Sequence, residues 1–253
     1  MRFCPIAGGS SGNALYIGTE KEHILVDAGV SGKRIYAALE SIGVSKINAL
    51  FLTHEHIDHC SGAAVVSKRF GAATFATEGT WQAMRQNIKG ERYKISHLRS
   101  VNLGSLRITP FNIPHDAAEP VGFLFESENK KIGVVTDIGY ATDSVIRALD
   151  GCDALLIEAN HDVDMLIKGS YPARLKERVL GAYGHLSNKA CGALLTRITR
   201  ENCKRIYLGH LSAENNTPEL ALETVLAAFS ANEIIPPKIA VVERSVASPC
   251  IEV

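Results

Sequence analysis

The sequence lacks any apolar run long enough to cross a bilayer. Its longest apolar stretches, such as 154–157, are far shorter than the roughly 18 residues that a membrane-spanning helix requires. No charged segment followed by an apolar stretch stands at the N-terminus, so a secretory signal is not expected. These absences exclude an integral membrane protein and predict a cytoplasmic protein without a membrane partner.

Closely paired cysteines and excess charge of one sign are also absent. The 6 cysteines are scattered singly, without a C-x-x-C pair, so we expect reduced thiols rather than the disulfide framework of a small secreted domain. Lys plus Arg and Asp plus Glu both number 27. A nucleic acid or another polyanion therefore has to be held by a local basic patch or by metal ions.

Long linkers, low-complexity tracts and repeats are missing as well, so we expect one domain over residues 1–253. Short β-branched runs alternate with segments of helical periodicity, which predicts an α/β (α+β) protein in which helices cover sheets. Strands are expected at 2–7, 14–17, 24–27, 49–52, 74–76, 106–111, 122–126, 131–136, 154–158, 205–208 and 238–242. Helices are expected at 32–42, 62–70, 143–149, 171–180, 187–199 and 218–229.

The strongest chemical signal is the segment THEHIDH at 53–59, between a predicted strand and a predicted helix. His54 and His56 are separated by one residue, so in extended backbone they project to the same side and can share a first metal ion. Asp58 and His59 follow where the chain bends, and they can face a second ion. Two ions need more ligands than this segment supplies, so further ligands have to come from elsewhere.

This motif, with Asp27 upstream at the end of an apolar strand, resembles the metallo-β-lactamase fold. The resemblance implies an αββα sandwich with a two-metal site at one edge. It implies His115 as the third ligand of the first ion, Asp137 as a bridging carboxylate and His210 as a ligand of the second ion. Each of these three residues follows a predicted strand. Asp27 is expected to orient a ligand imidazole or the motif loop through hydrogen bonds.

The narrower resemblance is to the YycJ/WalJ (VicX-like) group, and it covers nearly the whole chain. It rests on the segments GSSGN at 9–13, HDA at 115–117, EANHD at 158–162, GHLSN at 184–188 and GHLS at 209–212. Members of this group are similar to nucleases that depend on manganese or zinc, with 5′ exonuclease activity on DNA implied. The implied cofactors are two divalent transition-metal ions per chain, Mn or Zn, with Fe as a third candidate.

Glu158, His161 and His185 also resemble residues of the tRNA-processing endonuclease branch, where a Glu orients a non-ligand His near the scissile phosphate. In that role His185 would contact a phosphate oxygen or protonate the departing oxygen. The alternative for His185 is a helix N-terminal partner or a core histidine. His161 could support His185, lie nearer the metals or cap a helix.

Candidates for substrate contact lie in two kinds of segment. The Gly-rich turn offers Ser11 and Asn13, although a tight hairpin alone also needs such residues. Lys168 and Arg174 lie in a basic run before His185, although a solvated helix face is the more common explanation for such a run, which also contains acidic residues. Asn188 follows His185 at the start of a predicted helix.

Segment lengths separate this chain from other branches of the fold. The segment 138–209 is fully used by predicted strands and helices, which leaves no room for the additional domain of RNA-degrading and DNA-crosslink-repair relatives. The segment 116–136 is too short for the protruding arm of the tRNA-processing branch. A compact nuclease therefore fits best.

The resulting hypothesis is two-metal phosphodiester hydrolysis, with the chain as a 5′ to 3′ exonuclease on DNA rather than RNA. A hydroxide bridging the ions is the expected nucleophile, Asp58 would orient it or accept its proton, and His185 would assist the leaving group. One competing hypothesis is a small-molecule metallo-hydrolase acting on a lactam, lactone, thioester or cyclic phosphodiester. Another is a non-catalytic metal-binding regulator. The sequence is compatible with a homodimer and leaves open the native metal, DNA against RNA and the direction of digestion.

Overall fold

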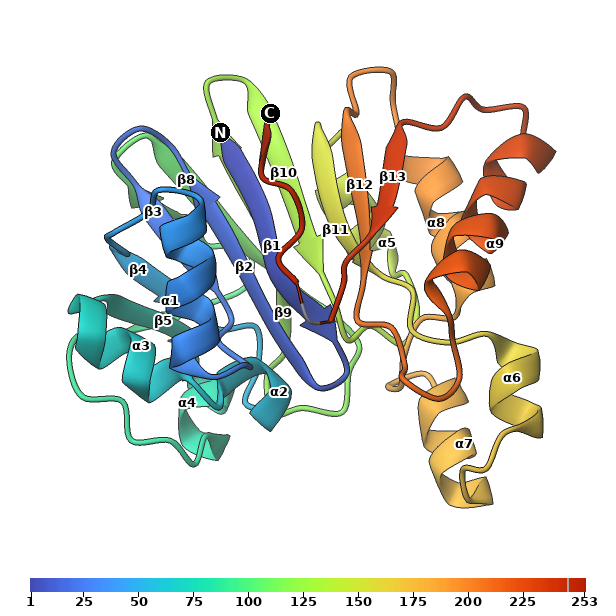
Figure 1. The fold of residues 1–253 in the computed structure, drawn as a ribbon, viewed down its shortest axis with the longest axis horizontal. Helices are drawn as coiled ribbons and strands as arrows, with labels where there is room; N and C mark the ends of the chain where they lie inside the picture. Colours follow the sequence, from blue (N-terminus) through green and yellow to red (C-terminus); the bar gives the residue numbers. More distant parts are fainter. Residues whose placement is uncertain (245) are drawn as a thin grey trace.

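Two β-sheets face each other in the computed structural model, which describes residues 1–244 and 246–253. The described residues place seven strands in each sheet, with helices on both outer faces (Figure 1). The first sheet has the order β14 (Ile251–Glu252), β1 (Arg2–Gly9), β2 (Gly12–Gly18), β3 (His23–Val26), β4 (Ala49–Phe51), β5 (Ala73–Thr77) and β6 (Arg92–Ile95). The second has the order β13 (Lys238–Val241), β12 (Arg205–Gly209), β11 (Ala154–Glu158), β10 (Lys130–Val135), β9 (Val121–Ser127), β8 (Leu106–Asn112) and β7 (Val101–Leu103).

The helices are divided between the two outer faces by their position in the chain. The first half contributes α1 (Gly32–Ser41), α2 (Ile57–Cys60), α3 (Ala63–Phe70) and α4 (Glu78–Ala83). The second half contributes α5 (Asp143–Leu149), α6 (Val163–Lys168), α7 (Ala173–Leu180), α8 (Asn188–Ile198) and α9 (Pro218–Ala231). The predicted αββα sandwich is therefore confirmed. None of the helices in the described chain has the length and apolar composition needed to cross a membrane.

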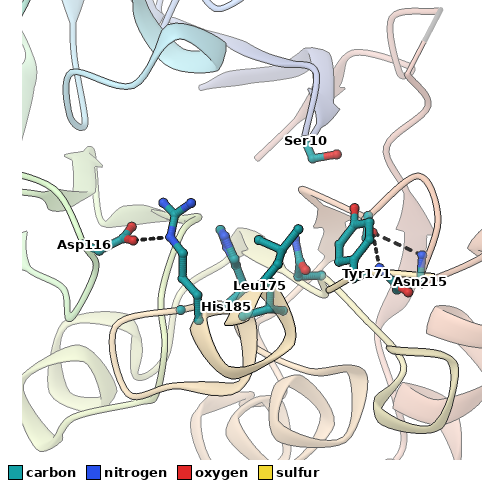
Figure 2. A pocket seen from close by; sticks show the side chains of 11 residues that line it. Ser10, Asp116, Tyr171, Leu175, His185 and Asn215 are labelled. Carbon is teal, nitrogen blue, oxygen red and sulfur yellow. Dashed lines mark hydrogen bonds and ion pairs between the residues drawn. The ribbon is translucent and has the colours of Figure 1, made fainter. Parts of the chain in front are cut away.

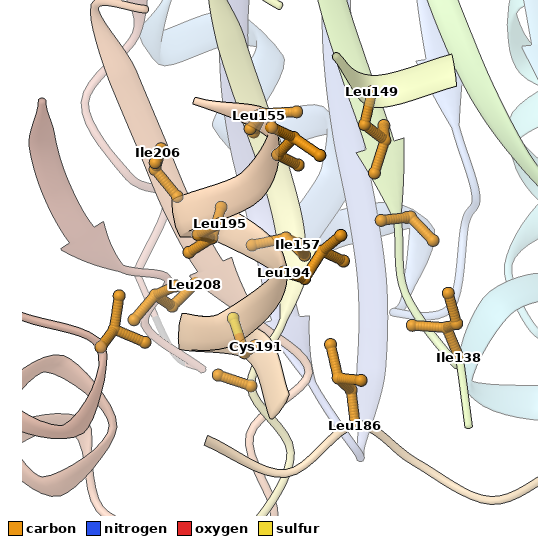
Figure 3. Packing of buried hydrophobic residues seen from close by; sticks show 14 of the residues in the cluster. Ile138, Leu149, Leu155, Ile157, Leu186, Cys191, Leu194, Leu195, Ile206 and Leu208 are labelled. Atoms are coloured by element: carbon orange, nitrogen blue, oxygen red, sulfur yellow. The ribbon is translucent and has the colours of Figure 1, made fainter. Parts of the chain in front are cut away.

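Three apolar layers hold this arrangement together. The central layer joins the two sheets and contains aromatic side chains from both, such as Phe51 and Phe123, whose ring centroids are 5.6 Å apart. On the outer face of the second sheet, Leu155 and Ile157 of β11 pack against Leu194 and Leu195 of α8 (Figure 3). A third cluster lies between the first sheet and α1 and α3. Each sheet is thus buried on both faces, as its near-continuous apolar strands require.

The strands that carry the site are parallel to one another. In the first sheet β3, β4, β5 and β6 pair in parallel, and in the second sheet β10, β11, β12 and β13 do the same. The carboxyl ends of parallel strands meet at one edge of a sheet, where ligand sites of α/β proteins form. The motif at 53–59 follows β4 and therefore lies at such an edge.

Most elements lie within one or two residues of their predicted bounds, and the differences involve short elements. Helices α2, α4 and α6 and strands β6, β7 and β14 were not predicted, because elements of two to six residues show too little periodicity to be recognised. The helix predicted from 171 begins at Ala173, with Pro172 as its N-cap. The helix predicted from 62 begins at Ala63 after a separate turn of α2.

The expectation of six reduced thiols is wrong for one pair. Cys4 and Cys250 form a disulfide across 246 residues of sequence, whereas the other four cysteines are free and buried. The pairing of β14 with β1 brings these two cysteines together. A contact of such long range leaves no signal in the spacing of cysteines along the chain.

Gly29 fixes the contact between the loop after β3 and the metal-ligand motif. The backbone N–H of Gly29 donates to the Asn13 carbonyl at 2.7 Å, and the neighbouring Ala28 N–H donates to the His59 carbonyl at 2.8 Å. A Cβ atom at position 29 would lie 1.6 Å from the backbone oxygen of Asp58. Only glycine therefore allows this loop to lie against the motif.

We predict that Gly29→Ala destabilises the protein and displaces the motif. A typical overpacking change costs about 1–3 kcal/mol. Because the obstacle here is backbone rather than a flexible side chain, we expect the free energy of unfolding to fall by about 3 kcal/mol or more. Thermal and urea unfolding would measure it. Gly43→Ala is the control, since position 43 has a φ of +71° but an added Cβ atom would meet no described residue within 4 Å apart from its chain neighbours. This variant should lose only about 1–2 kcal/mol. Equal losses in the two variants would contradict the steric explanation.

Candidate metal centre

Three residues of the site adopt left-handed backbone conformations where their strands end. Asp27 follows β3 with φ 58°, Asp137 lies just beyond β10 with φ 56°, and His210 follows β12 with φ 55°. A left-handed conformation costs a non-glycine residue about 1–2 kcal/mol. Such strain persists where the surrounding structure holds it in place, and it is typical of functional sites.

The first group of donor atoms consists of three histidines from both sheets. His54 and His56 follow β4, and His115 comes from the loop after β8. His54 Nε2 lies 3.1 Å from His56 Nδ1, which lies 3.3 Å from His115 Nε2. Nitrogens bound to one tetrahedral ion at about 2.0–2.1 Å are separated by roughly 3.3–3.4 Å. This spacing therefore fits one metal ion held by three imidazoles.

The second group combines two carboxylates with two histidines. His210 Nε2 lies 3.3 Å from Asp58 Oδ2 and 3.4 Å from Asp137 Oδ1. His59 Nε2 lies 2.9 Å from Asp137 Oδ2, a buried oxygen with no hydrogen-bond partner among the described residues. One donor atom from each of these four residues lies within 4.8 Å of the others. The donor set fits a second divalent ion.

Asp137 lies between the two groups. In addition to its contacts with the second group, its Oδ1 atom lies 3.7 Å from His115 Nε2 of the first. A carboxylate in this position is suited to bridge two ions. The structure thus brings together all seven residues that the sequence identified as candidate ligands, and their role as ligands stays a prediction.

The electrostatics of the site favour a bound cation. Burial lowers the pKa of His54 and of His115, so both imidazoles are neutral and their lone pairs can bind a metal. Burial would also lower the pKa of His210, but Asp137, Asp58 and Glu158 outweigh it and raise that pKa to about 10. The negative groups that favour a proton here favour a metal ion for the same reason.

Asp27 orients the motif through hydrogen bonds and does not belong to the clusters of donor atoms. Its Oδ1 accepts a hydrogen bond from the Thr53 backbone N–H at 2.8 Å, and its Oδ2 accepts one from the Thr53 hydroxyl at 2.8 Å. The same Oδ2 lies 2.7 Å from His59 Nδ1. This contact favours a proton on Nδ1, which makes Nε2 the nitrogen available to a metal ion. Asp27 orients both the imidazole and the loop, the two alternatives that the sequence left open.

Glu158 connects His210 to His185. Its Oε1 lies 2.7 Å from His210 Nδ1 and 2.8 Å from His185 Nδ1, while its Oε2 accepts hydrogen bonds from the backbone N–H groups of Ile138 and Leu186. With four hydrogen bonds to its two oxygens, this fully buried carboxylate has no lone pair left for a metal. Glu158 is a positioning residue for the two imidazoles.

His185 lies beside the candidate metal ligands. Its Nδ1 is 3.8 Å from Asp137 Oδ1, and donor atoms of His185, Asp137, Glu158 and His210 lie within 4.8 Å of one another, although the Glu158 oxygens are occupied by hydrogen bonds. Burial would lower its pKa, but the charge and hydrogen bond of Glu158 outweigh this effect and raise the pKa above its usual value. His185 therefore holds a proton more readily than a free histidine.

His161 does not join any of these clusters. Its side chain is buried, its Nδ1 lies 3.3 Å from Asn160 Oδ1, and its Nε2 has no partner among the described residues. Burial lowers its pKa to about 4, so it stays neutral. Its backbone pairs with Ser187 next to His185, which places His161 behind the loop that carries His185.

The predicted substrate contacts receive uneven support. Asn188 is buried, and its side-chain amide donates a hydrogen bond to Asn216 Oδ1 at 2.9 Å, so its contact with a substrate stays a prediction. Asn13 is also buried, with its amide 3.0 Å from His59 Nε2, so it lies against the motif. Ser11, Lys168 and Arg174 are exposed on the surface.

The structure adds residues that the sequence analysis did not select for the site. A pocket beside His185 is also lined by Asp116, Tyr171 and Arg178 (Figure 2). Asp116 directly follows His115, and this position was the one available signal of its location. Arg178 comes from the basic run before His185, but helical sequence alone does not show which of its charges face the site.

Comparisons with known proteins find relatives over most of the chain. Residues 22–211 match the Beta-lactamase superfamily domain. The curated protein Exodeoxyribonuclease YycJ of Bacillus anthracis is 36% identical over 231 residues, which cover 89% of this chain and 88% of the relative. Exodeoxyribonuclease WalJ of Streptococcus pneumoniae serotype 2 is 39% identical over 235 residues, covering 89% and 87%.

Solved structures show the same fold at low identity. The metallo-β-lactamase fold protein YhfI of Bacillus subtilis superposes with a TM-score of 0.73 at 14% identity, covering 98% of both chains. Zn²⁺-bound PqqB of Methylobacterium extorquens gives a TM-score of 0.73 at 16% identity, covering 98% of this chain and all of the other. The similarity to these two structures concerns the fold alone.

We predict that the purified protein carries two transition-metal ions per chain and that His56→Ala and His210→Ala each lower this content. Each substitution removes one donor from a different group, and incomplete sites bind metal more weakly. Elemental analysis of the three proteins would measure the change. His97→Ala is the matched control, because this histidine is exposed and outside the donor clusters. Unchanged metal content in both site variants would overturn the ligand assignment.

Proposed function

The chain belongs to the β-lactamase superfamily of metal-dependent hydrolases, and we propose that it is an exodeoxyribonuclease that releases nucleotides from the 5′ end of DNA. The observation that carries the proposal is the pair of donor groups joined by Asp137, in a chain whose curated relatives are named exodeoxyribonucleases. Two divalent ions, Mn or Zn, fit this donor set. A phosphodiester with its negative charge is the substrate that such a site suits.

Metal ions bound here would activate a water molecule and neutralise the charge of the phosphate. The chain provides the groups that orient the reactants. The Asp58 side chain is 27% exposed and reaches the second donor group from the solvent side. Burial would raise its pKa, but hydrogen bonds from His210 and His59 hold the pKa well below its usual value. Asp58 therefore stays ionised, and we assign it to orientation rather than to proton acceptance.

His185 is suited to protonate the departing oxygen. Glu158 binds its Nδ1 at 2.8 Å, which fixes the ring and leaves Nε2 as the atom available to a substrate. The side chain is 20% exposed and lines the pocket next to the metal centre. The raised pKa favours the protonated imidazole, whose Nε2 carries the proton that a general acid donates. This geometry favours catalysis over the alternative of a core histidine.

The substrate class can be tested directly. End-labelled single- and double-stranded DNA and RNA should be incubated with the pure protein and Mn or Zn, together with nitrocefin and a thioester. We expect nucleotides to be released from DNA, with preference for a 5′-phosphorylated end, and chelation should stop the reaction. Rapid lactam or thioester hydrolysis without any cleavage of nucleic acid would contradict the proposal and favour a small-molecule hydrolase.

The role of His185 can be tested by substitution. We expect His185→Ala to retain both metal ions and its melting temperature but to lose about 10²- to 10⁴-fold in turnover, the usual contribution of a general acid. The loss should be smaller for a p-nitrophenyl phosphodiester, because its leaving group scarcely needs a proton. Turnover on both substrates, metal content and thermal unfolding would be measured on the same preparations.

Two results separate this role from a structural one. Equal losses on the two substrates, or a large fall in melting temperature, would count against leaving-group protonation. Glu158→Gln provides a second readout, because loss of the negative charge lowers the pKa of His185. Activity that depends on protonated His185 is lost as the pH rises through that pKa, so the alkaline limb of the profile should move to lower pH in Glu158→Gln.

A further inference from the structure

The pocket that begins at His185 extends away from the metal centre. It encloses about 160 Å³ between the β1–β2 turn and the segment around α7. Figure 2 shows Asp116 at one end and Tyr171 and Asn215 at the other, with His185 and Leu175 between them and Ser10 facing them. Because His185 lines this pocket, a group bound in it lies next to the departing oxygen that His185 would protonate.

The two walls of the pocket differ in chemistry. The ring of Tyr171 and the side chain of Leu175 provide an apolar wall, whereas Ser10, Ser212 and Asn215 provide a polar one. Asn215 is buried, and its Oδ1 has no hydrogen-bond partner among the described residues. An acceptor of this kind is suited to a ligand that brings an N–H or O–H group. The ligand thus needs an apolar face and a hydrogen-bond donor at its edge.

Arg178 supplies positive charge at the end nearest the metal centre. Its Nε donates to Asp116 Oδ2 at 2.5 Å, and Asp116 Oδ1 lies 3.4 Å from His115 Nε2. This ion pair fixes the direction of the guanidinium group. Within the part of the chain that the structure describes, its Nη atoms have no hydrogen-bond partner, so they can bind a phosphate oxygen.

From these three features we propose that the pocket binds the unpaired terminal nucleoside of the DNA strand, with Arg178 on the adjacent scissile phosphate. The base lies on Tyr171, and an N–H group of its edge donates to Asn215. Every nucleobase has a flat face and an N–H donor, so the pocket accepts a terminal nucleotide of any sequence. The sugar oxygen that departs on hydrolysis then lies beside His185. This assignment rests on the proposed nuclease function. It explains why the enzyme would cleave at a strand end, because an unpaired terminal nucleoside can enter the pocket.

Equilibrium binding of thymidine 3′-monophosphate, whose phosphate takes the position of the scissile phosphate, to the metal-loaded protein, measured by calorimetry, tests the pocket independently of turnover. We expect Arg178→Met to weaken binding by about 10- to 100-fold, the worth of a charge-assisted hydrogen bond. Tyr171→Ala should weaken it by about 5- to 100-fold through lost stacking, whereas Tyr171→Phe should bind like the wild type. Both side chains lie partly in solvent, so the variants are expected to fold, which their melting temperatures would verify.

Arg200→Met is the matched control, because Arg200 also pairs with an aspartate, Asp150, at 2.6 Å. This ion pair lies at the C-terminal ends of α8 and α5, and neither residue lines the pocket. Equal affinities in the wild type, Arg178→Met and Tyr171→Ala would overturn the pocket assignment. So would inorganic phosphate binding as tightly as the nucleotide, since no nucleoside contact would then contribute. DNA cleavage is measured separately: nucleotide binding through Arg178 and Tyr171 without any cleavage would support the pocket and overturn the nuclease function.

Discussion

The crowding of imidazoles and carboxylates at the strand ends is the constraint on which the rest of the site depends. Three ring nitrogens, from His54, His56 and His115, converge on one point. Each nitrogen of a neutral imidazole is either a donor or an acceptor, so the three cannot all form hydrogen bonds with one another. Next to them, Asp137 brings a buried oxygen that has no hydrogen-bond partner within the described part of the chain. Without a cation this cluster would be costly to bury. The backbone strain at Asp27, Asp137 and His210 is part of the same cost of placing the donors.

Glu158 connects the two chemical tasks of the site. One carboxylate oxygen contacts a candidate metal ligand and a candidate acid, His210 and His185, while the other is fixed by two backbone N–H groups. The imidazole of His185 is therefore positioned relative to the metal centre by the buried Glu158 side chain rather than by a flexible loop. A change in the charge of one imidazole therefore shifts the pKa of the other, because both contact the same carboxylate oxygen.

The sequence predicted the architecture well because the long elements have clear periodicity and boundaries. Strand β11 (Ala154–Glu158) and helix α5 (Asp143–Leu149) have the bounds that the sequence predicts. The motif at 53–59 could be read because its donors are neighbours in the chain. In contrast, His115, Asp137 and His210 are far apart in sequence, and only the family resemblance indicated that they meet.

Contacts between side chains on different elements could not be predicted from the sequence. The pairing of Arg178 with Asp116 depends on how α7 packs beside the loop after β8, and the burial of Asn188 depends on its bond to Asn216. Neither has a local signature. The Cys4–Cys250 disulfide belongs to the same class, because only the formation of the sheet brings its two cysteines together.

Each donor group contains residues from both sheets, and this has a kinetic consequence. An ion held by His54 and His115, or by His59 and His210, would link one sheet to the other across the edge of the sandwich. Metal exchange then requires either that one side chain swings out or that the sheets separate at this edge. Because the imidazoles of His54, His59, His115 and His210 are buried, the first route is hindered. Ion exchange in the loaded protein is therefore coupled to local opening between the sheets, and amide hydrogens near the site should exchange on the same timescale.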